Sequence, residues 1–272
     1  MRTAARLRRR VTWVVLGLWL ACAVLAVFIA APLAGLIARG VTQGDILDAL
    51  SRPFVQATVR LSILTTVLTV AAAVVFGTPV AYVLARHRFP GYAALDTLMD
   101  VPVVLPPVVG GLALLLAYGR AGWLGGPLHA AGLDVAFTTG AVVLAQMFVA
   151  VPFYIRAAQA GFESVDRRFE AVSATLGAAP WRTFRRITAP LALPSLAGGA
   201  VMCWARALGE FGATLMFAGS LPGRTQTLPL AIMQSFEASV DDAIAIAILL
   251  VFVAFVVLLT FKVLARVGGR AL

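Results

Sequence analysis

Long apolar stretches recur along the chain and constrain its fold more than any other feature. Six of them carry few charges, at residues 13–37, 55–84, 101–118, 137–155, 196–218 and 243–264. A helix needs about 20 apolar residues to cross the roughly 30 Å hydrocarbon core of a bilayer. We therefore predict an all-α, polytopic membrane protein with about six transmembrane helices, forming a single domain over residues 1–272.

Composition excludes an ordinary soluble domain. Hydrophobic residues make up 61% of the chain and charged residues 12%, against about 45–50% and about 25% in soluble domains. The run at residues 13–37 is longer than the roughly 7–15 residues of a secretory signal's apolar region, so we expect it to be a span. Cys22 and Cys203 both fall inside expected spans and indicate neither a disulfide framework nor a metal site.

The third apolar stretch is irregular. Its first half is crowded by Pro102, Pro106, Pro107, Gly110 and Gly111. Proline removes a backbone donor and kinks or breaks a helix, so we predict a kinked or broken start to this span. The stretch at residues 55–84 is longer than a bilayer requires and predicts a helix that tilts or protrudes.

The distribution of cationic residues predicts the orientation. With six spans both termini share one side, and that side holds 16 of the 22 Lys and Arg residues. The opposite side holds Arg39, Arg52, Arg120 and Arg224. By the positive-inside rule, the termini and the polar segment at residues 163–190 are cytoplasmic. Because the net charge of +10 is scattered over loops and span ends, it does not indicate nucleic-acid binding.

Motifs for catalysis are absent from the sequence. There is no P-loop, GxSxG or HExxH motif and no pair of carboxylates within a span. His87 and His129 fall in short connections, where a solvated side chain is the simplest interpretation. We therefore expect no enzyme active site, no catalytic residue, and no metal or cofactor bound by this chain.

The segment at residues 163–190 is too polar for lipid and has the pattern of two short helices. Asp166 or Ser164 is suited to cap a helix over residues 167–176, and Gly177 suits the left-handed turn that ends it. Pro180 is placed to open a second helix, which we expect to end before Pro190. The sequence predicts a helix-turn-helix on the cytoplasmic face.

This segment resembles the EAA loop of ABC-importer permeases. Nine residues separate Gly177 from Ile187, and Ala189-Pro190 follows, as in that family's pattern of EAA, three residues, Gly, nine residues, Ile, one residue, Leu-Pro. The family's Glu-Ala-Ala would fall on residues 171–173, whereas the glutamate here is Glu170, one residue earlier. Ala189 replaces the family's leucine.

Two further stretches, residues 101–111 and 206–214, resemble the molybdate branch of the molybdate/sulfate permeases, and residues 222–233 continue the resemblance. It implies a type I importer permease that works by alternating access. Two copies would form the path for an oxyanion, most simply molybdate. A dimer of cytoplasmic ATPase subunits would hold ATP and Mg, and a solute-binding protein would deliver the anion outside.

The resemblance also implies that the polar segment docks on the ATPase as a coupling helix. Apolar anchors ringed by arginines have the composition of a docking element. The residues we expect to dock are Phe169, Glu170, Ala171, Leu176, Gly177, Ala178 and Trp181. The alternative is an ordinary cytoplasmic connection with a solvated charged face.

Residues for the translocation path are suggested by charge and by small size within the spans. Arg206 and Glu210 are one helical turn apart, so they either line the pore or form a structural ion pair. Arg60 either extends to the surface or attracts anions. Gly209 and Gly212 would allow helices to approach closely around a gate.

Other functions remain open from the sequence. A sulfate/thiosulfate or tungstate permease fits equally well, because these anions share the tetrahedral shape of molybdate. A self-sufficient anion channel or secondary transporter is a different class. The lack of a carboxylate chain for proton coupling disfavours it.

Overall fold

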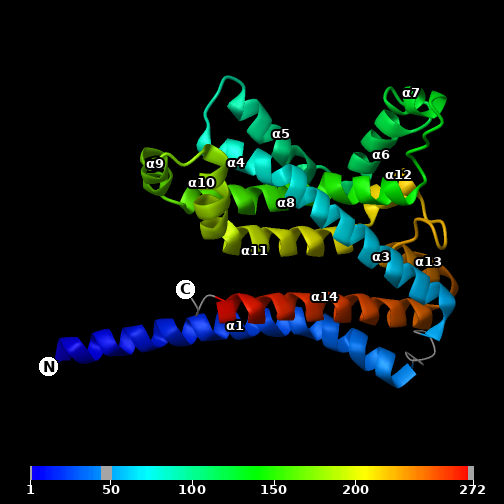
Figure 1. Ribbon diagram of the computed structural model, residues 1–272. Coiled ribbons are helices and arrows are strands. Elements are labelled where there is room, and N and C mark those ends of the chain that lie inside the picture. Colours follow the sequence, from blue (N-terminus) through cyan, green and yellow to red (C-terminus); the bar gives the residue numbers. More distant parts are fainter. Residues whose placement is uncertain (1, 44–50, 269–272) are drawn as a thin grey trace.

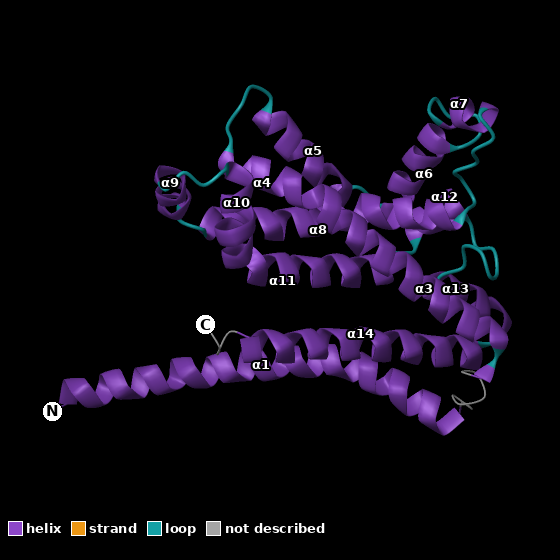
Figure 2. Cartoon of the chain, in the orientation of Figure 1, coloured by secondary structure: helices purple, strands orange, loops and turns teal. Residues whose placement is uncertain are grey.

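The computed structural model describes residues 2–43 and 51–268, with side chains described within residues 15–42 and 51–263. The regular elements in these ranges are helices, most of them lying roughly parallel (Figure 1; Figure 2). Five helices are long and apolar enough to cross a membrane, and a bent pair makes up to six. The prediction of an all-α protein with about six spans is confirmed.

The first and last long helices lie side by side at one edge of the bundle. They are α1 (Arg2–Gln43) and α14 (Val240–Gly268). Large apolar side chains on α1, such as Trp19 and Phe28, are exposed, as expected for a helix that faces lipid. Cys22 lies exposed on the same helix.

The core is built around α8 (Thr139–Ser164). It packs against α11 (Ala189–Leu208) and against the second span, which consists of α3 (Pro53–Ala72), the π turn η1 (Ala73–Gly77) and α4 (Thr78–Arg86). Small residues bring these helices together: a Cβ added at Gly199 would lie 2.8 Å from the Cβ of Ala157. Close helix approach through small residues is the usual way to pack spans in lipid.

The third predicted span is a bent pair. Helix α5 (Tyr92–Val104) meets α6 (Pro107–Tyr118) at an angle of 116° across Leu105 and Pro106. The prediction of a broken start is therefore confirmed. The helical segment that precedes the break, over residues 92–100, was not predicted.

The fifth span differs from its prediction at both ends. The helix opened by Pro180 does not end before Pro190 but continues through α10 (Pro180–Thr183), the π turn η2 (Phe184–Thr188) and α11 to Leu208. Pro190 is tolerated because π turns rearrange the hydrogen bonds that a proline disrupts. The expected span at residues 196–218 instead stops at Gly209, and α12 (Gly212–Ala218) is a separate short helix.

Two further helices lie in segments expected to be loops. They are α7 (Gly125–Ala130) and α13 (Leu228–Ala238), and α13 packs against α14. Both lie at the opposite end of the bundle from α9 (Arg167–Thr175), the first helix of the polar segment (Figure 1).

Candidate functional site

Helix α9 begins as the sequence predicts. The side chain of Asp166 caps it by accepting a hydrogen bond of 2.9 Å from the backbone N–H of Arg168. Ser164 does not cap this helix, because its hydroxyl donates to the carbonyl of Gly161 in the preceding helix at 2.8 Å. An N-cap satisfies a backbone donor that the first helical turn leaves free.

Gly177 ends α9 in a left-handed turn with φ of 75°. The N–H of Gly177 donates to the carbonyl of Ala174, and the N–H of Ala178 donates to the carbonyl of Ser173, which is a Schellman motif. A Cβ added at Gly177 would meet nothing within 4 Å. Within this chain, the requirement for glycine therefore comes from the backbone conformation and not from lack of space.

The exposed side of α9 carries an apolar stripe. Phe169, Val172 and Leu176 are 55%, 59% and 82% exposed, at the spacing of one helical face. Val172 was not among the predicted residues, although its position three residues after Phe169 could have indicated it. Ala171 lies beside the stripe and is also exposed.

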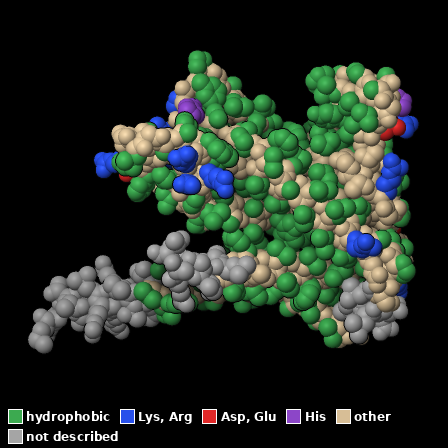
Figure 3. Space-filling view, viewed as in Figure 1, with side chains coloured by type: hydrophobic (Ala, Val, Ile, Leu, Met, Phe, Trp, Pro, Cys, Tyr) green, Lys and Arg blue, Asp and Glu red, His purple; other side chains and the backbone are tan. Residues whose placement is uncertain are grey.

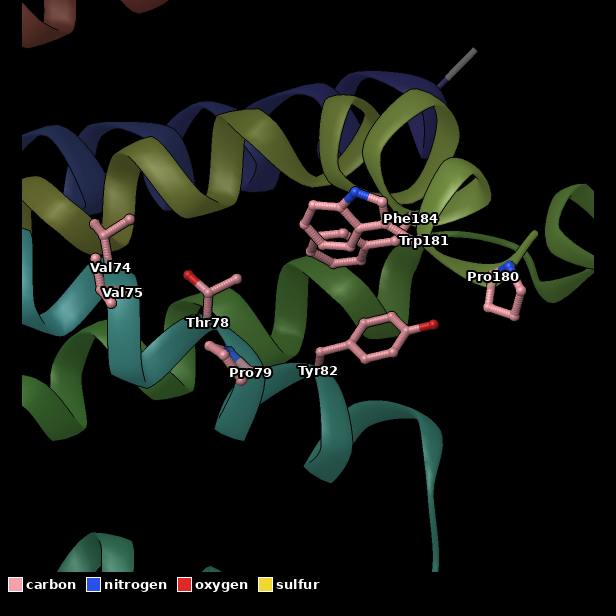
Figure 4. A pocket seen from close by; sticks show the side chains of 8 residues that line it. All are labelled: Val74, Val75, Thr78, Pro79, Tyr82, Pro180, Trp181 and Phe184. Atoms are coloured by element: carbon pink, nitrogen blue, oxygen red, sulfur yellow. The ribbon is translucent and has the colours of Figure 1, made fainter. Parts of the chain in front are cut away.

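Trp181 lies elsewhere. Its ring stacks on Phe184 with centroids 5.5 Å apart, and it lines a groove formed with η1 and α4 (Figure 4). The structure therefore brings Phe169 and Leu176 onto one stripe of α9, whereas the exposed Trp181 lines the groove.

Glu170 faces its own subunit. Its carboxylate forms an ion pair of 3.0 Å with Arg86 at the end of α4 and accepts a hydrogen bond of 2.8 Å from Thr188 in η2. The side chain of Arg86 is only 5% exposed and also donates to the carbonyl of Val165 at 3.0 Å. Because 84 residues separate Arg86 from Glu170, no local spacing could reveal this pair.

A second contact joins the two helices of the polar segment directly. The hydroxyls of Ser173 on α9 and Thr183 on α10 lie 2.8 Å apart and are buried. Together with the Glu170 contacts, this bond ties α9 to the second and fifth spans. A displacement of α9 would therefore be transmitted to both.

The Arg206–Glu210 pair predicted for the fifth span forms, with 2.8 Å between Nη2 and Oε2. Glu210 is 1% exposed, and its other oxygen accepts a hydrogen bond of 2.8 Å from the N–H of Ala213. The carboxylate thus satisfies a backbone donor in the first turn of α12 while it neutralises Arg206. This geometry is that of a pair that fixes the break between α11 and α12.

The two glycines near this break differ. A Cβ at Gly212 would lie 3.1 Å from Pro107 and Val108 at the start of α6, so Gly212 does permit a close approach. Gly209 is exposed, and the nearest atom to an added Cβ is 3.7 Å away. Arg60 lies exposed on α3, and among the residues described no ion pair joins it to Glu210, whose partner is Arg206.

An ion-pair cluster between α5 and α8 was not predicted. Arg156 on α8 contacts Asp96 and Asp100 on α5, each at 2.5 Å, and donates to Gln159 at 2.8 Å. Two carboxylates four residues apart on a helix face are the sequence signal that could have suggested a shared cationic partner. The cluster attaches the first half of the bent pair to the core helix.

Both histidines of the chain have exposed side chains. His87 is exposed, and His129 lies 2.8 Å from Asp134, which also pairs with Arg120 at 3.0 Å. Hydrogen bonds from the Arg120 guanidinium lower the pKa of the Asp134 carboxyl. Within the described part of the chain, no three His, Cys, Asp or Glu side chains converge as metal ligands would.

Comparison with known proteins identifies the family. Residues 73–267 match the family model described as binding-protein-dependent transport system inner membrane component. The chain is 44% identical over 233 residues to the molybdenum transport system permease protein ModB of Mycobacterium tuberculosis, covering 86% of this chain and 88% of that protein. It is 40% identical over 182 residues to the sulfate transport system permease protein CysW of Synechococcus elongatus, covering 67% and 64%.

The fold is also that of a solved transporter. A chain of a bacterial ABC transporter involved in the import of the acidic polysaccharide alginate matches with a TM-score of 0.75 at 17% identity, over 98% of this chain and 99% of that one. The protein is therefore a multi-pass inner membrane protein and a translocation subunit rather than an ATPase. The chain belongs to the family of binding-protein-dependent transport system inner membrane components, the permeases of ABC importers.

Proposed function

We propose that this permease imports molybdate. The observation that carries the proposal is the 44% identity to a molybdenum permease across 86% of the chain. The sulfate permease covers a smaller share, 67%. Sulfate/thiosulfate and tungstate permeases are the alternatives, since these anions are similar in shape and charge.

The orientation we propose follows from charge. Both termini and α9 lie in the cytoplasm, because most Lys and Arg residues gather at that end. A second copy of the chain completes the path, and residues 1–272 act as one membrane domain. A solute-binding protein delivers the anion at the end that carries α7, and it supplies most of the selectivity.

Helix α9 is the proposed docking element for a cytoplasmic ATPase dimer, which holds ATP and Mg. The exposed stripe of Phe169, Val172 and Leu176 supports this role, since clustered apolar anchors are typical of interface centres. Gly177 and Ala178 shape the turn beside it, and Ala171 flanks it. Glu170 supports the docking surface from behind through Arg86 and Thr188.

Alternating access is the mechanism we infer. Closure of the ATPase dimer would draw the paired α9 helices together, and the contacts of Glu170 and Ser173 would pass the movement to the spans. For Arg206 we favour the structural role. A guanidinium neutralised by a buried carboxylate attracts anions weakly.

Two measurements test the proposal. The permease should co-purify with the ATPase encoded or expressed beside it, and uptake of labelled molybdate should fall when unlabelled tungstate is added and much less with sulfate. Stronger competition by sulfate would favour the sulfate alternative. Anion flux through the purified permease alone would show a channel or secondary transporter.

A further inference from the structure

An apolar groove runs along the outside of the second and fifth spans (Figure 4). It has a volume of about 540 Å³ and lies between η1 and α4 on one side and α10 and η2 on the other. Val75, Pro79, Tyr82, Trp181 and Phe184 are among its lining residues. This volume is in the range of about 300–1,000 Å³ that holds small molecules in other proteins.

Three arginines stand beside this groove. A second hollow of about 370 Å³ is lined by Trp181, Arg182, Arg185 and Arg186, so Trp181 separates it from the apolar groove. In the part of the chain that the structure describes, none of these three arginines forms an ion pair with a carboxylate. These three arginines form a patch whose positive charge no carboxylate of the described residues balances.

The patch and the groove lie at the end of the membrane-spanning region. One candidate span ends at Arg86 and another begins at Pro180. The groove extends from these span ends to Val74 and Val75, about three helical turns before Arg86. Figure 3 shows Lys and Arg side chains at the level of α10 with hydrophobic side chains next to them. Charged side chains beside an apolar surface near the end of a span are typical of the boundary between headgroups and water.

We propose that this site binds a phospholipid with an anionic headgroup. One acyl chain fills the apolar groove, and the headgroup phosphate lies against Arg182, Arg185 and Arg186. Guanidinium groups match phosphate oxygens in geometry and charge, and tryptophan favours the boundary between headgroups and acyl chains. A zwitterionic lipid would fill the groove but brings no net negative charge to the three arginines, and a free phosphate would not use the groove at all.

A lipid at this site would affect the connection between α9 and the spans. The walls of the groove are the same two spans that Glu170 joins through Arg86 and Thr188. A bound lipid would contact both walls and stiffen their connection to α9. This step rests on the proposed coupling function, whereas lipid binding itself requires only that the chain spans the membrane with these arginines at the headgroup level.

Native mass spectrometry of the full-length permease with its ATPase tests the proposal. The probes are palmitoyl-oleoyl phosphatidylglycerol, the phosphatidylcholine with the same chains, and glycerol phosphate as a free headgroup. We expect preferential retention of phosphatidylglycerol. Because each basic residue contributes about fivefold, the triple variant Arg182→Gln, Arg185→Gln, Arg186→Gln should lose affinity on the order of 100-fold. The triple Arg→Lys variant should retain most of the preference.

Two variants control for fold and location. Arg224→Gln removes an exposed arginine at the other end of the bundle and should leave lipid retention unchanged. Trp181→Ala should weaken retention of both lipids, because it opens the groove. Thermal unfolding of each variant checks that the fold persists.

Several results would overturn the lipid site. One is equal retention of the two lipids by the wild type, or retention of phosphatidylglycerol by the triple Gln variant. Loss of the ATPase in that variant with unchanged lipid binding would assign the arginines to the ATPase contact. Loss of the dimer in Trp181→Ala with unchanged lipid binding would assign the groove to the second copy. If no ATPase associates with the wild type, the proposed coupling function is wrong. Lipid retention by the permease alone would then still test the lipid site.

Discussion

Glu170 joins three elements of the chain through one carboxylate. It lies on α9, pairs with Arg86 at the end of α4 and accepts a hydrogen bond from Thr188 in η2. Arg86 is almost fully buried, so its positive charge needs a carboxylate partner within the fold, and Glu170 supplies it. Glu170 lies one residue earlier than the glutamate of the EAA pattern. Its contacts are within its own subunit.

Replacing Glu170 with Gln should uncouple transport. The amide can still accept from Thr188 but no longer neutralises Arg86, which should destabilise the fold by about 1–3 kcal/mol. We expect the ATPase to remain bound and to hydrolyse ATP while uptake falls, because α9 is less firmly attached to the spans. Uptake and ATP hydrolysis measured in the same proteoliposomes check this.

The matched control is Glu163→Gln. Glu163 is exposed and accepts a hydrogen bond from Gln159 at 3.1 Å, so the same change should leave both activities close to wild type. If Glu170→Gln transports as well as the wild type, the ion pair between Glu170 and Arg86 is not needed for coupling. If it releases the ATPase instead, Glu170 belongs to the docking surface.

At the scale of helices, the cap and the turn of α9 were predicted correctly from the sequence, whereas contacts between residues far apart in the chain were not. The cap at Asp166 and the turn at Gly177 depend on neighbouring residues, and the sequence predicted both. Apolar length alone extended the fifth span too far, because it does not register the contacts of Glu210 with Arg206 and Ala213 that fix the end of α11. Helix α13 packs against α14, which follows it directly in the chain. The Arg156 cluster joins α8 to α5 across 56 and 60 residues, beyond the reach of any spacing rule.

The contact between α6 and α12 depends on Gly111. A Cβ there would lie 2.7 Å from both Cα and O of Ala213, which are backbone atoms that cannot rotate away. Gly111→Ala should therefore force the two helices apart and destabilise the protein by about 1–3 kcal/mol. Gly198→Ala is the matched control on α11, where an added Cβ meets nothing within 4 Å.

Thermal unfolding of the two purified alanine variants shows whether the change in stability comes from the α6–α12 contact or from helix propensity. Gly198→Ala should be neutral or stabilising by up to about 1 kcal/mol, because alanine favours a helix. An equal effect of both substitutions would show that the α6–α12 contact yields easily. It would also show that the bent pair of α5 and α6 is not held rigidly against α12.

Across the whole molecule, the two ends of the bundle differ in character. One end carries α9, the arginines beside α10 and the start of α1 (Figure 1). The other end carries α7, α13 and the paired residues Arg120 and Asp134. This asymmetry is the structural counterpart of the charge distribution from which the orientation was predicted.

Cysteine labelling tests that orientation. Arg88→Cys lies between α4 and α5 near α9, and Leu133→Cys lies beside α7, where Leu133 is 60% exposed. In intact cells a membrane-impermeant maleimide should react with Leu133→Cys and not with Arg88→Cys. Cys22 should be replaced in both, whereas Cys203 is buried and should stay unreactive. The reverse labelling pattern would place α9 outside.

The π turn η2 changes how positions along the fifth span should be counted. A π turn is equivalent to one residue inserted into an α-helix, so every residue beyond Thr188 is rotated by about 100° from the face that regular helical counting from Pro180 would give. The nine residues between Gly177 and Ile187 include part of this insertion. Deleting one residue there would turn the span out of phase with its own coupling helix without changing a single apolar side chain on either face.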